Sequence, residues 1–82
     1  MDTKQKYVRL KEYNEIIIFP QVLGHDEFKG FNPISAGFCY VKKESIECFG
    51  KSIGLGIESK EDDTFIATKQ IYGWDAAEQL IP

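Results

Sequence analysis

The amino-acid sequence predicts one α+β domain, in which an antiparallel sheet of four to five strands carries one or two C-terminal helices packed on one face. Two observations support this prediction. Short β-branched or alternating segments, interrupted by Gly or Pro, fill the first two thirds of the chain, whereas helical spacing appears only after residue 58. At 82 residues, with 43% hydrophobic and 28% charged side chains, the chain fits a single domain over residues 1–82, with residues 1–5 as a loose polar leader.

Two strands are expected before Pro20. Residues 7–10 alternate weakly, with Val8 on one side and Arg9 on the other. Residues 15–19 form a continuous β-branched run that is typical of a strand covered on both faces. Pro20 ends this strand because proline cannot donate a hydrogen bond to the ladder.

A connection over residues 21–34 precedes a predicted hairpin. Within the connection, residues 25–28 are expected to form one helical turn that places Phe28 on the core. Residues 34–41 and 45–49 then have the composition of two strands around a short turn. A turn centred on residues 43–44 pairs Val41 with Ile46, Cys39 with Cys48, and Phe38 with Phe49. The first two pairs share one face and the aromatic pair occupies the other, so this register is self-consistent.

Residues 52–57 show the cleanest alternation in the chain and predict a further strand. Its three apolar side chains would share one face, with Gly54 and Gly56 on the other. Glycines on an open strand face usually mark the close approach of another group.

A helix is expected after Ser59 and up to Gly73. Ser59 with Asp62 resembles a capping box, and Gly73 is suited to the C-terminal stop. The predicted buried face is made of Ile66, Ala67, Gln70 and Ile71. The same segment is also rich in β-forming residues, so a strand over 64–72 remains an alternative.

A second short helix is expected from Asp75. Its predicted buried side chains are Ala76, Ala77, Leu80 and Ile81. Trp74 is expected in the core, with a surface anchor for a partner as the alternative.

The charge distribution argues against nucleic-acid binding. The net charge is −3; residues 1–41 carry five basic and five acidic side chains, and residues 42–82 carry five basic and eight acidic ones. The one basic patch, which contains Lys4, Lys6, Arg9 and Lys11, is short for a nucleic-acid backbone. The sequence has no apolar run long enough for a membrane span and no signal-peptide pattern, so we expect a soluble, cytoplasmic protein with reduced cysteines.

Each pattern that suggests catalysis or a cofactor lacks a required residue. Residues 50–52 resemble the end of a phosphate-binding loop, but Ser45 stands where the first glycine is required. Cys39 and Cys48 have no second pair to complete a zinc site, and we expect two buried free thiols, with a cross-strand disulfide as the alternative. The consecutive carboxylates 61–63 lack the alternate spacing of a calcium loop. We therefore expect no cofactor, no metal and no catalytic set.

A resemblance to known proteins can be stated from the order of five motifs. The chain contains IIIFP, HDEF, PISAGFC, FGKSIGLGIES and EDDTFIATKQIYG, within about residues 7–73. This order resembles a group of short, uncharacterised proteins found in phage and bacterial mobile-element sequences. The resemblance implies an accessory factor that binds a host protein, and it implies no chemistry for any residue.

The sequence therefore predicts a non-enzymatic protein-binding factor, with inhibition of a host defence protein as the finer expectation. A small ligand-binding or hydrolytic protein that uses His25 with Asp26 is one alternative, and a homo-oligomeric structural protein is the other. The candidate partner-binding residues lie in a histidine turn, a glycine-containing strand, an acidic helix start and one tryptophan. They are His25, Asp26, Lys51, Ser52, Gly54, Gly56, Glu58, Glu61, Asp62, Asp63 and Trp74.

Overall fold

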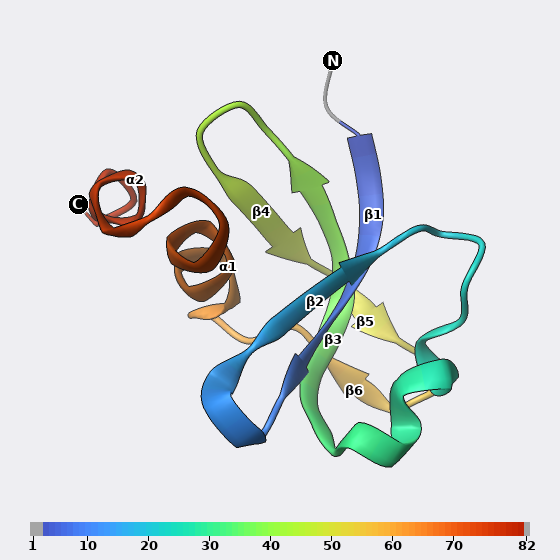
Figure 1. The fold of residues 1–82 in the computed structure, drawn as a ribbon. Coiled ribbons are helices and arrows are strands. Elements are labelled where there is room, and N and C mark those ends of the chain that lie inside the picture. Colours follow the sequence, from blue (N-terminus) through green and yellow to red (C-terminus); the bar gives the residue numbers. More distant parts are fainter. Residues whose placement is uncertain (1–2, 82) are drawn as a thin grey trace.

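The computed structural model describes residues 3–81 and has an α+β fold (Figure 1). Its main sheet is antiparallel, with four strands in the order β2-β1-β3-β4. These strands are β1 (Thr3–Leu10), β2 (Ile16–Phe19), β3 (Pro33–Val41) and β4 (Ile46–Phe49). A second sheet pairs β5 (Lys51–Ser52) with β6 (Ile57–Glu58). The helical elements are η1 (Glu12–Asn14), η2 (His25–Phe31), α1 (Asp63–Tyr72) and α2 (Trp74–Glu78). The predicted fold class is confirmed.

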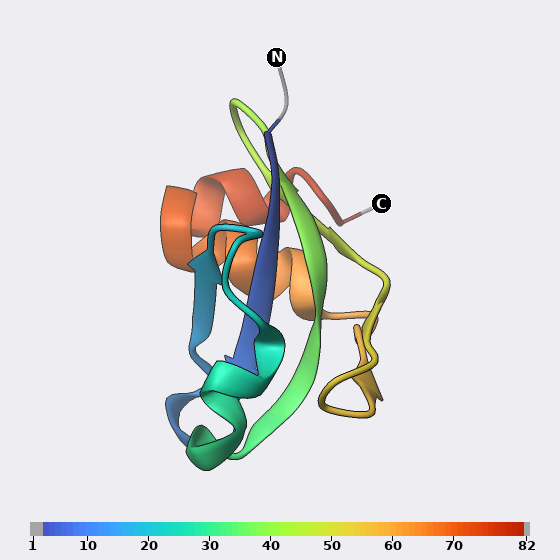
Figure 2. The same cartoon turned by 90° about the vertical axis from the view of Figure 1, so that its right-hand side faces the viewer.

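Both faces of the main sheet are covered. Figure 1 shows α1 on one side of the sheet and η2 on the other, and Figure 2 shows the two C-terminal helices above η2 and the β5–β6 hairpin. The face toward α1 buries Tyr7, Ile16, Cys39, Ile46 and Ala67. The opposite face buries Val8, Phe19 and Ala36 against Phe28, Leu55 and Ile57. Burial of a Val, Ile or Phe side chain, such as Val8, Ile16 or Phe19, contributes roughly 1.5–3 kcal/mol.

The β3–β4 hairpin has the predicted register. Phe38 faces Phe49, Cys39 faces Cys48, and Val41 faces Ile46. The Lys42 amide donates to the Ser45 carbonyl (2.9 Å), which leaves residues 43–44 as the turn. The predicted turn at residues 25–28 is also present and extends to residue 31, with Phe28 on the core.

Side chains of α1 close both edges of the main sheet. Thr64 and Thr68, one helical turn apart, accept hydrogen bonds from the backbone amides of Cys48 and Ile46 on β4 (both 2.9 Å). On the other edge, Gln70 accepts from the Ile16 amide (2.7 Å) and donates to the Ile16 carbonyl (2.6 Å). An unpaired strand edge is a template for association, so these contacts block strand addition at three positions.

The prediction of a strand over residues 52–57 is wrong. Only Ser52 and Ile57 pair, and the chain reverses between them through a turn in which the Gly56 amide donates to the Ser52 carbonyl (2.9 Å). Gly56 has a φ of +69°, in the left-handed region that favours glycine. Ile53 points to solvent while Leu55 and Ile57 pack on the core, so the alternation does not describe one strand face.

The C-terminal segment is helical, and the strand alternative for residues 64–72 is wrong. The helix begins at Asp63 with Asp62 at its N-cap position and no side-chain capping bond, so Ser59 does not cap it as the predicted capping box requires. On α1 the fully buried side chains are Asp63, Ala67 and Thr68. Gln70 and Ile71, which we expected to be buried, are exposed: Gln70 bonds the Ile16 backbone at the β2 edge instead of entering the core, and Ile71 is 50% exposed.

The second helix buries less than predicted. Ala77 is buried, but Leu80, Ile81 and Trp74 are exposed. The reason is that α2 packs mainly against α1.

The N-terminal residues also differ from the prediction. Residues 3–5 pair with β3 and are part of the sheet, so they are not a loose leader; residues 1–2 of that prediction lie outside the described residues. Within residues 3–81, neither helix is long and apolar enough to cross a membrane.

Candidate functional site

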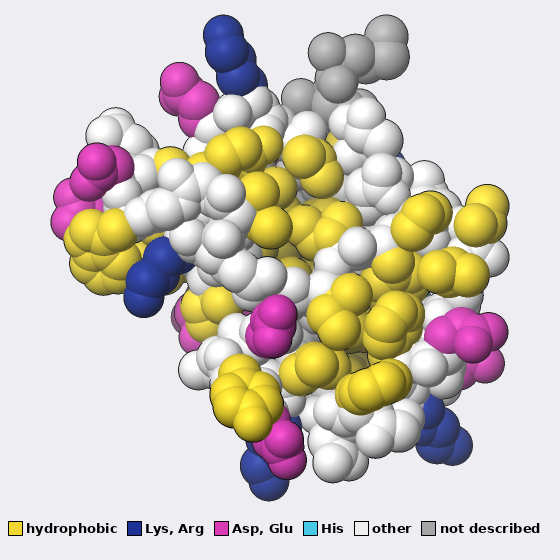
Figure 3. Space-filling view, in the orientation of Figure 1, with side chains coloured by type: hydrophobic (Ala, Val, Ile, Leu, Met, Phe, Trp, Pro, Cys, Tyr) yellow, Lys and Arg dark blue, Asp and Glu magenta, His cyan; other side chains and the backbone are white. Residues whose placement is uncertain are grey.

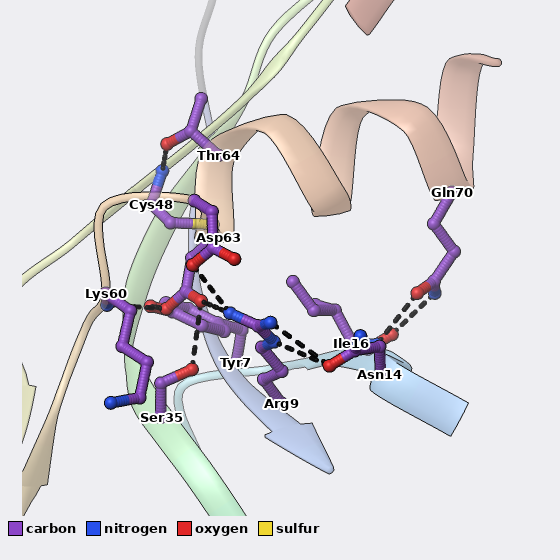
Figure 4. A network of polar contacts seen from close by, with 11 residues as sticks. Tyr7, Arg9, Asn14, Ile16, Ser35, Cys48, Lys60, Asp63, Thr64 and Gln70 are labelled. Atoms are coloured by element: carbon purple, nitrogen blue, oxygen red, sulfur yellow. Dashed lines mark hydrogen bonds and ion pairs between the residues drawn. The ribbon is translucent and has the colours of Figure 1, made fainter. Parts of the chain in front are cut away.

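A buried polar network centred on Asp63 joins α1 to the sheet (Figure 4). The fully buried Asp63 carboxylate accepts hydrogen bonds from Tyr7 Oη, from Arg9 (2.9 Å) and from Ser35 Oγ (3.0 Å). The Lys60 amide donates to the same carboxylate (2.9 Å). A buried carboxylate is tolerated only when it is paired and fully hydrogen-bonded, which these four donors achieve.

Burial and charge shift the pKa values of this network. Burial, followed by the hydrogen bond and charge of Asp63, raises the pKa of the Tyr7 hydroxyl far above its ordinary value. Burial opposes the charge on Arg9, but its hydrogen bonds with Asp62 and Asp63 outweigh that effect and raise the Arg9 pKa. The Arg9 hydrogen bond lowers the pKa of Asp62.

The network is arranged to hold the fold rather than to perform chemistry. Ser35 already donates to Asp63, and both residues are fully buried, so a substrate has no access to them. Among the described residues, every buried polar side-chain atom has a hydrogen-bond partner. What the network does is fix the start of α1 against β1 and β3.

The network also reaches the turn between β1 and β2. Arg9 donates to the Asn14 side chain through Nε (3.3 Å) and through its second terminal nitrogen (3.1 Å). Asn14 and Tyr13 both have left-handed backbones, with φ of 50° and 66°. Asparagine adopts this conformation readily, whereas for the bulky Tyr13 it is an outlier. The Tyr13 side chain is 89% exposed, so burial does not compensate for its strained backbone.

A hollow lies between this turn and the end of η2. Its volume is about 350 Å³, and its walls carry Leu10, Glu12, Tyr13, Glu15 and Phe31. Phe31 is 60% exposed. The Lys11 amide donates to the Asn32 carbonyl (3.2 Å), which ties the two walls together. Among the described residues that line the hollow, none is a lysine or an arginine. We call this feature the Tyr13–Phe31 hollow.

Four of the candidate partner-binding residues do come together on the β5–β6 hairpin. Lys51, Ser52, Gly56 and Glu58 line an open pocket of about 580 Å³ beside the exposed Ile53. Ser52 itself is buried, and its Oγ accepts from the Leu55 amide (3.1 Å), so its role is to shape the turn. The hairpin surface therefore offers Lys51, Glu58 and Ile53 to a partner.

His25 has a packing role in the fold. The imidazole is buried, its Nε2 lies 2.7 Å from the Gly37 carbonyl oxygen, and the rings of Phe19 and Phe38 meet it edge-on. Asp26 is exposed and lies next to the hairpin, since a Cβ on Gly54 would be 3.9 Å from the Asp26 Cβ. Nothing among these contacts favours catalysis by His25.

The acidic helix start is not a continuous surface. Asp63 is buried, Asp62 is held by Arg9 (2.7 Å), and only Glu61 is exposed without such a contact. Trp74 is half-exposed, packs edge-on against Phe65 and lies beneath the Lys69 ammonium (4.8 Å). Of the acidic candidates, Glu58 lies on the hairpin, whereas Glu61 and Trp74 are not among the residues that line the hairpin pocket.

Cys39 and Cys48 are free thiols on adjacent strands. Burial raises the pKa of Cys39 to about 11, and burial also raises the pKa of Cys48. Both thiols therefore behave as small apolar side chains near neutral pH. No metal-binding cluster of three His, Cys, Asp or Glu side chains occurs within residues 3–81.

Sequence reasoning missed Tyr13 and Phe31. For Tyr13, the signal in the sequence was an aromatic residue inside the polar segment Glu-Tyr-Asn-Glu, at positions 12–15, where no core position is expected. Comparison with protein-family models, curated proteins and solved structures gives no match to this chain.

Proposed function

We propose that this chain is a non-enzymatic protein-binding factor whose partner docks on the face formed by β2, the following loop and η2. The observation that carries the proposal is the apolar exposure of that face, to which Val22 and Phe31 contribute most. Val22 is 90% exposed, and Leu23 beside it is partly exposed. Figure 3 shows hydrophobic side chains gathered over β2 and η2. We call the surface of Val22, Leu23, Phe28 and Phe31 the apolar face.

Contiguous apolar surface of this kind marks an interaction site more often than isolated exposed side chains do. The apolar face is also firmly supported from below. The centroid of the Phe28 ring lies 4.5 Å from that of the buried Phe19 ring and 6.3 Å from that of the Phe31 ring. The Lys6 ammonium donates a hydrogen bond to the Leu23 carbonyl (2.8 Å). A partner would therefore meet a surface that is already ordered, which lowers the entropic cost of binding.

Two features favour a different protein over a second copy of this chain as the partner. Side chains of α1 occupy outward backbone groups on both edge strands, which disfavours assembly by strand pairing. The chain also carries a net charge of −3, so two copies repel each other. Inhibition of a host defence protein is the finer form of the proposal; it rests on the resemblance to mobile-element proteins and is tested by the identity of the partner.

The test compares two variants, each of which places an aspartate at a highly exposed apolar position. Val22→Asp changes the apolar face, and Ile53→Asp changes the tip of the β5–β6 hairpin, where the side chain is 88% exposed. Each tagged variant and the wild type is used for cross-linked capture from host cells, followed by mass spectrometry. We expect one protein to be retained by the wild type and by Ile53→Asp and lost by Val22→Asp.

Two outcomes would contradict the proposal. Loss of the partner only in Ile53→Asp would place binding on the hairpin, where four of the candidate residues named from the sequence lie. Capture of only the chain itself, together with a dimer in sedimentation equilibrium that Val22→Asp dissociates, would support the homo-oligomeric alternative.

A further inference from the structure

We propose that the Tyr13–Phe31 hollow binds a cationic side chain, lysine or arginine, presented by the protein partner. This inference rests on the proposed function, because it assigns the hollow to the same partner that covers the apolar face. Phe31 belongs to both surfaces, so the hollow continues the apolar face at its edge.

The chemistry of the lining is that of a cation site. The exposed faces of Tyr13 and Phe31 attract a cation through the ring quadrupole. The same hollow carries the carboxylates of Glu12 and Glu15, and among its described lining residues there is no lysine or arginine to neutralise them. Aromatic rings beside uncompensated carboxylates complement a long aliphatic side chain that ends in a positive charge.

These two aromatic rings are available to a partner. Within the described chain, the cation–π contacts are those of Lys4 with Phe38 (4.6 Å) and of Lys69 with Trp74 (4.8 Å). Phe38 and Trp74 are thus already occupied by lysines of this chain, whereas Tyr13 and Phe31 carry no such contact. A volume of about 350 Å³ suits one side chain of a larger partner.

The hollow is held open by the fold. The Leu10 amide donates to the Glu15 carbonyl (2.8 Å), Lys11 is bonded to Asn32, and Arg9 holds the Asn14 side chain. Tyr13 and Asn32, on opposite walls, both have left-handed backbones. Such non-glycine conformations cost about 1–3 kcal/mol each and persist only where the surroundings impose them. At Tyr13, the left-handed backbone displays an aromatic ring that contributes nothing to the core.

The test is a titration of the ¹⁵N-labelled chain, followed by NMR amide shifts, with three capped tripeptides. Two are cationic, with lysine or arginine between glycines, and the third has norleucine as a neutral isostere of lysine. We expect saturable shifts at Tyr13, Glu15, Phe31 and Asn32 with the cationic peptides alone. Tyr13→Ala is expected to weaken this binding about 2- to 5-fold, and Tyr13→Phe is expected to preserve it.

A charge control tests whether the cationic peptides bind to the hollow or are attracted only by the negative net charge of the chain. Glu15→Gln is expected to weaken peptide binding, whereas Glu58→Gln, an equal charge change on the hairpin, is expected to leave it unchanged. Equal shifts with the norleucine peptide, or equal affinities for wild type and Tyr13→Ala, would overturn the inference.

The inference and the proposed function fail in different ways. If Val22→Asp loses the partner while Tyr13→Ala keeps both its partner and its peptide affinity, the hollow has no such role and the apolar face remains the docking site. If the peptides bind as expected but Val22→Asp retains the partner, the apolar face is the part that is wrong.

Discussion

Arg9 shows how one buried residue can join parts of the chain that are distant in sequence. It bonds Asp62 and Asp63, more than 50 positions away, and also Asn14, five positions away. It thereby fixes the start of α1 and the turn that displays Tyr13 at the same time. In the sequence Arg9 belongs to a short basic patch, and a lone arginine on an alternating segment gives no indication of its distant acidic partners.

Removing the Asp63 charge tests this network. Asp63→Asn keeps the shape of the side chain but leaves Arg9 with the half-exposed Asp62 alone. We expect a loss of about 3 kcal/mol in the free energy of unfolding, measured by urea denaturation, because a buried charge loses its buried partner. The matched control Asp62→Asn is expected to cost less than about 1 kcal/mol. Equal losses in the two variants would show that Asp63 is not the centre of the network.

The two thiols, of which Cys39 is buried and Cys48 is half-buried, give a pH-dependent prediction. Cys39 titrates near 9 when unfolded and near 11 when folded, so its burial stabilises the fold below pH 9, and this contribution is lost as the pH rises toward 11. The raised pKa values of Cys48 and Tyr7 act in the same direction. We expect the urea midpoint to fall between pH 9 and 11, and a thiol reagent at pH 8 to react slowly until the chain is unfolded. Rapid labelling of the folded chain would contradict this account.

At the scale of elements, α1 both covers the sheet and closes its edges. The main-sheet strands, the hairpin register and the C-terminal helix could be predicted because each has a local signal: alternation, a continuous β-branched run, or a period of about 3.6 residues. The edge contacts could not, because Thr64, Thr68 and Gln70 meet strands that lie 16 to 54 positions away. The hairpin at 51–58 was misread because a tight turn around Gly56 has the same alternation as a strand.

Thr68→Val tests the edge contact. Valine has nearly the shape of threonine but cannot accept the hydrogen bond from the Ile46 amide, which is then buried without a partner. We expect a loss of about 1–3 kcal/mol in the free energy of unfolding. Thr64→Val, at a half-buried site on the same edge, is expected to cost less, because water can reach the Cys48 amide. The reverse order of the two losses would contradict this account.

At the scale of the whole molecule, the buried polar groups serve the fold, whereas exposed apolar side chains occur on the apolar face, at the hairpin tip (Ile53) and on the C-terminal helices (Ile71 and Trp74). Four of the candidate residues named from the sequence lie together on the hairpin, but the emphasis fell on glycines and acidic residues that shape or anchor the chain. The apolar face was missed because Val22 and Phe31 lie in a connection, where periodicity says nothing about burial.

The most direct test of the central claim is a hydrogen–deuterium exchange footprint of the chain bound to its captured partner. We predict slower exchange at residues 20–31 and at the 11–15 turn, with residues 51–58 and 74–81 unchanged. Protection confined to residues 51–58 or to 74–81, with residues 20–31 exchanging as in the free chain, would contradict the claim that the apolar face is the docking site.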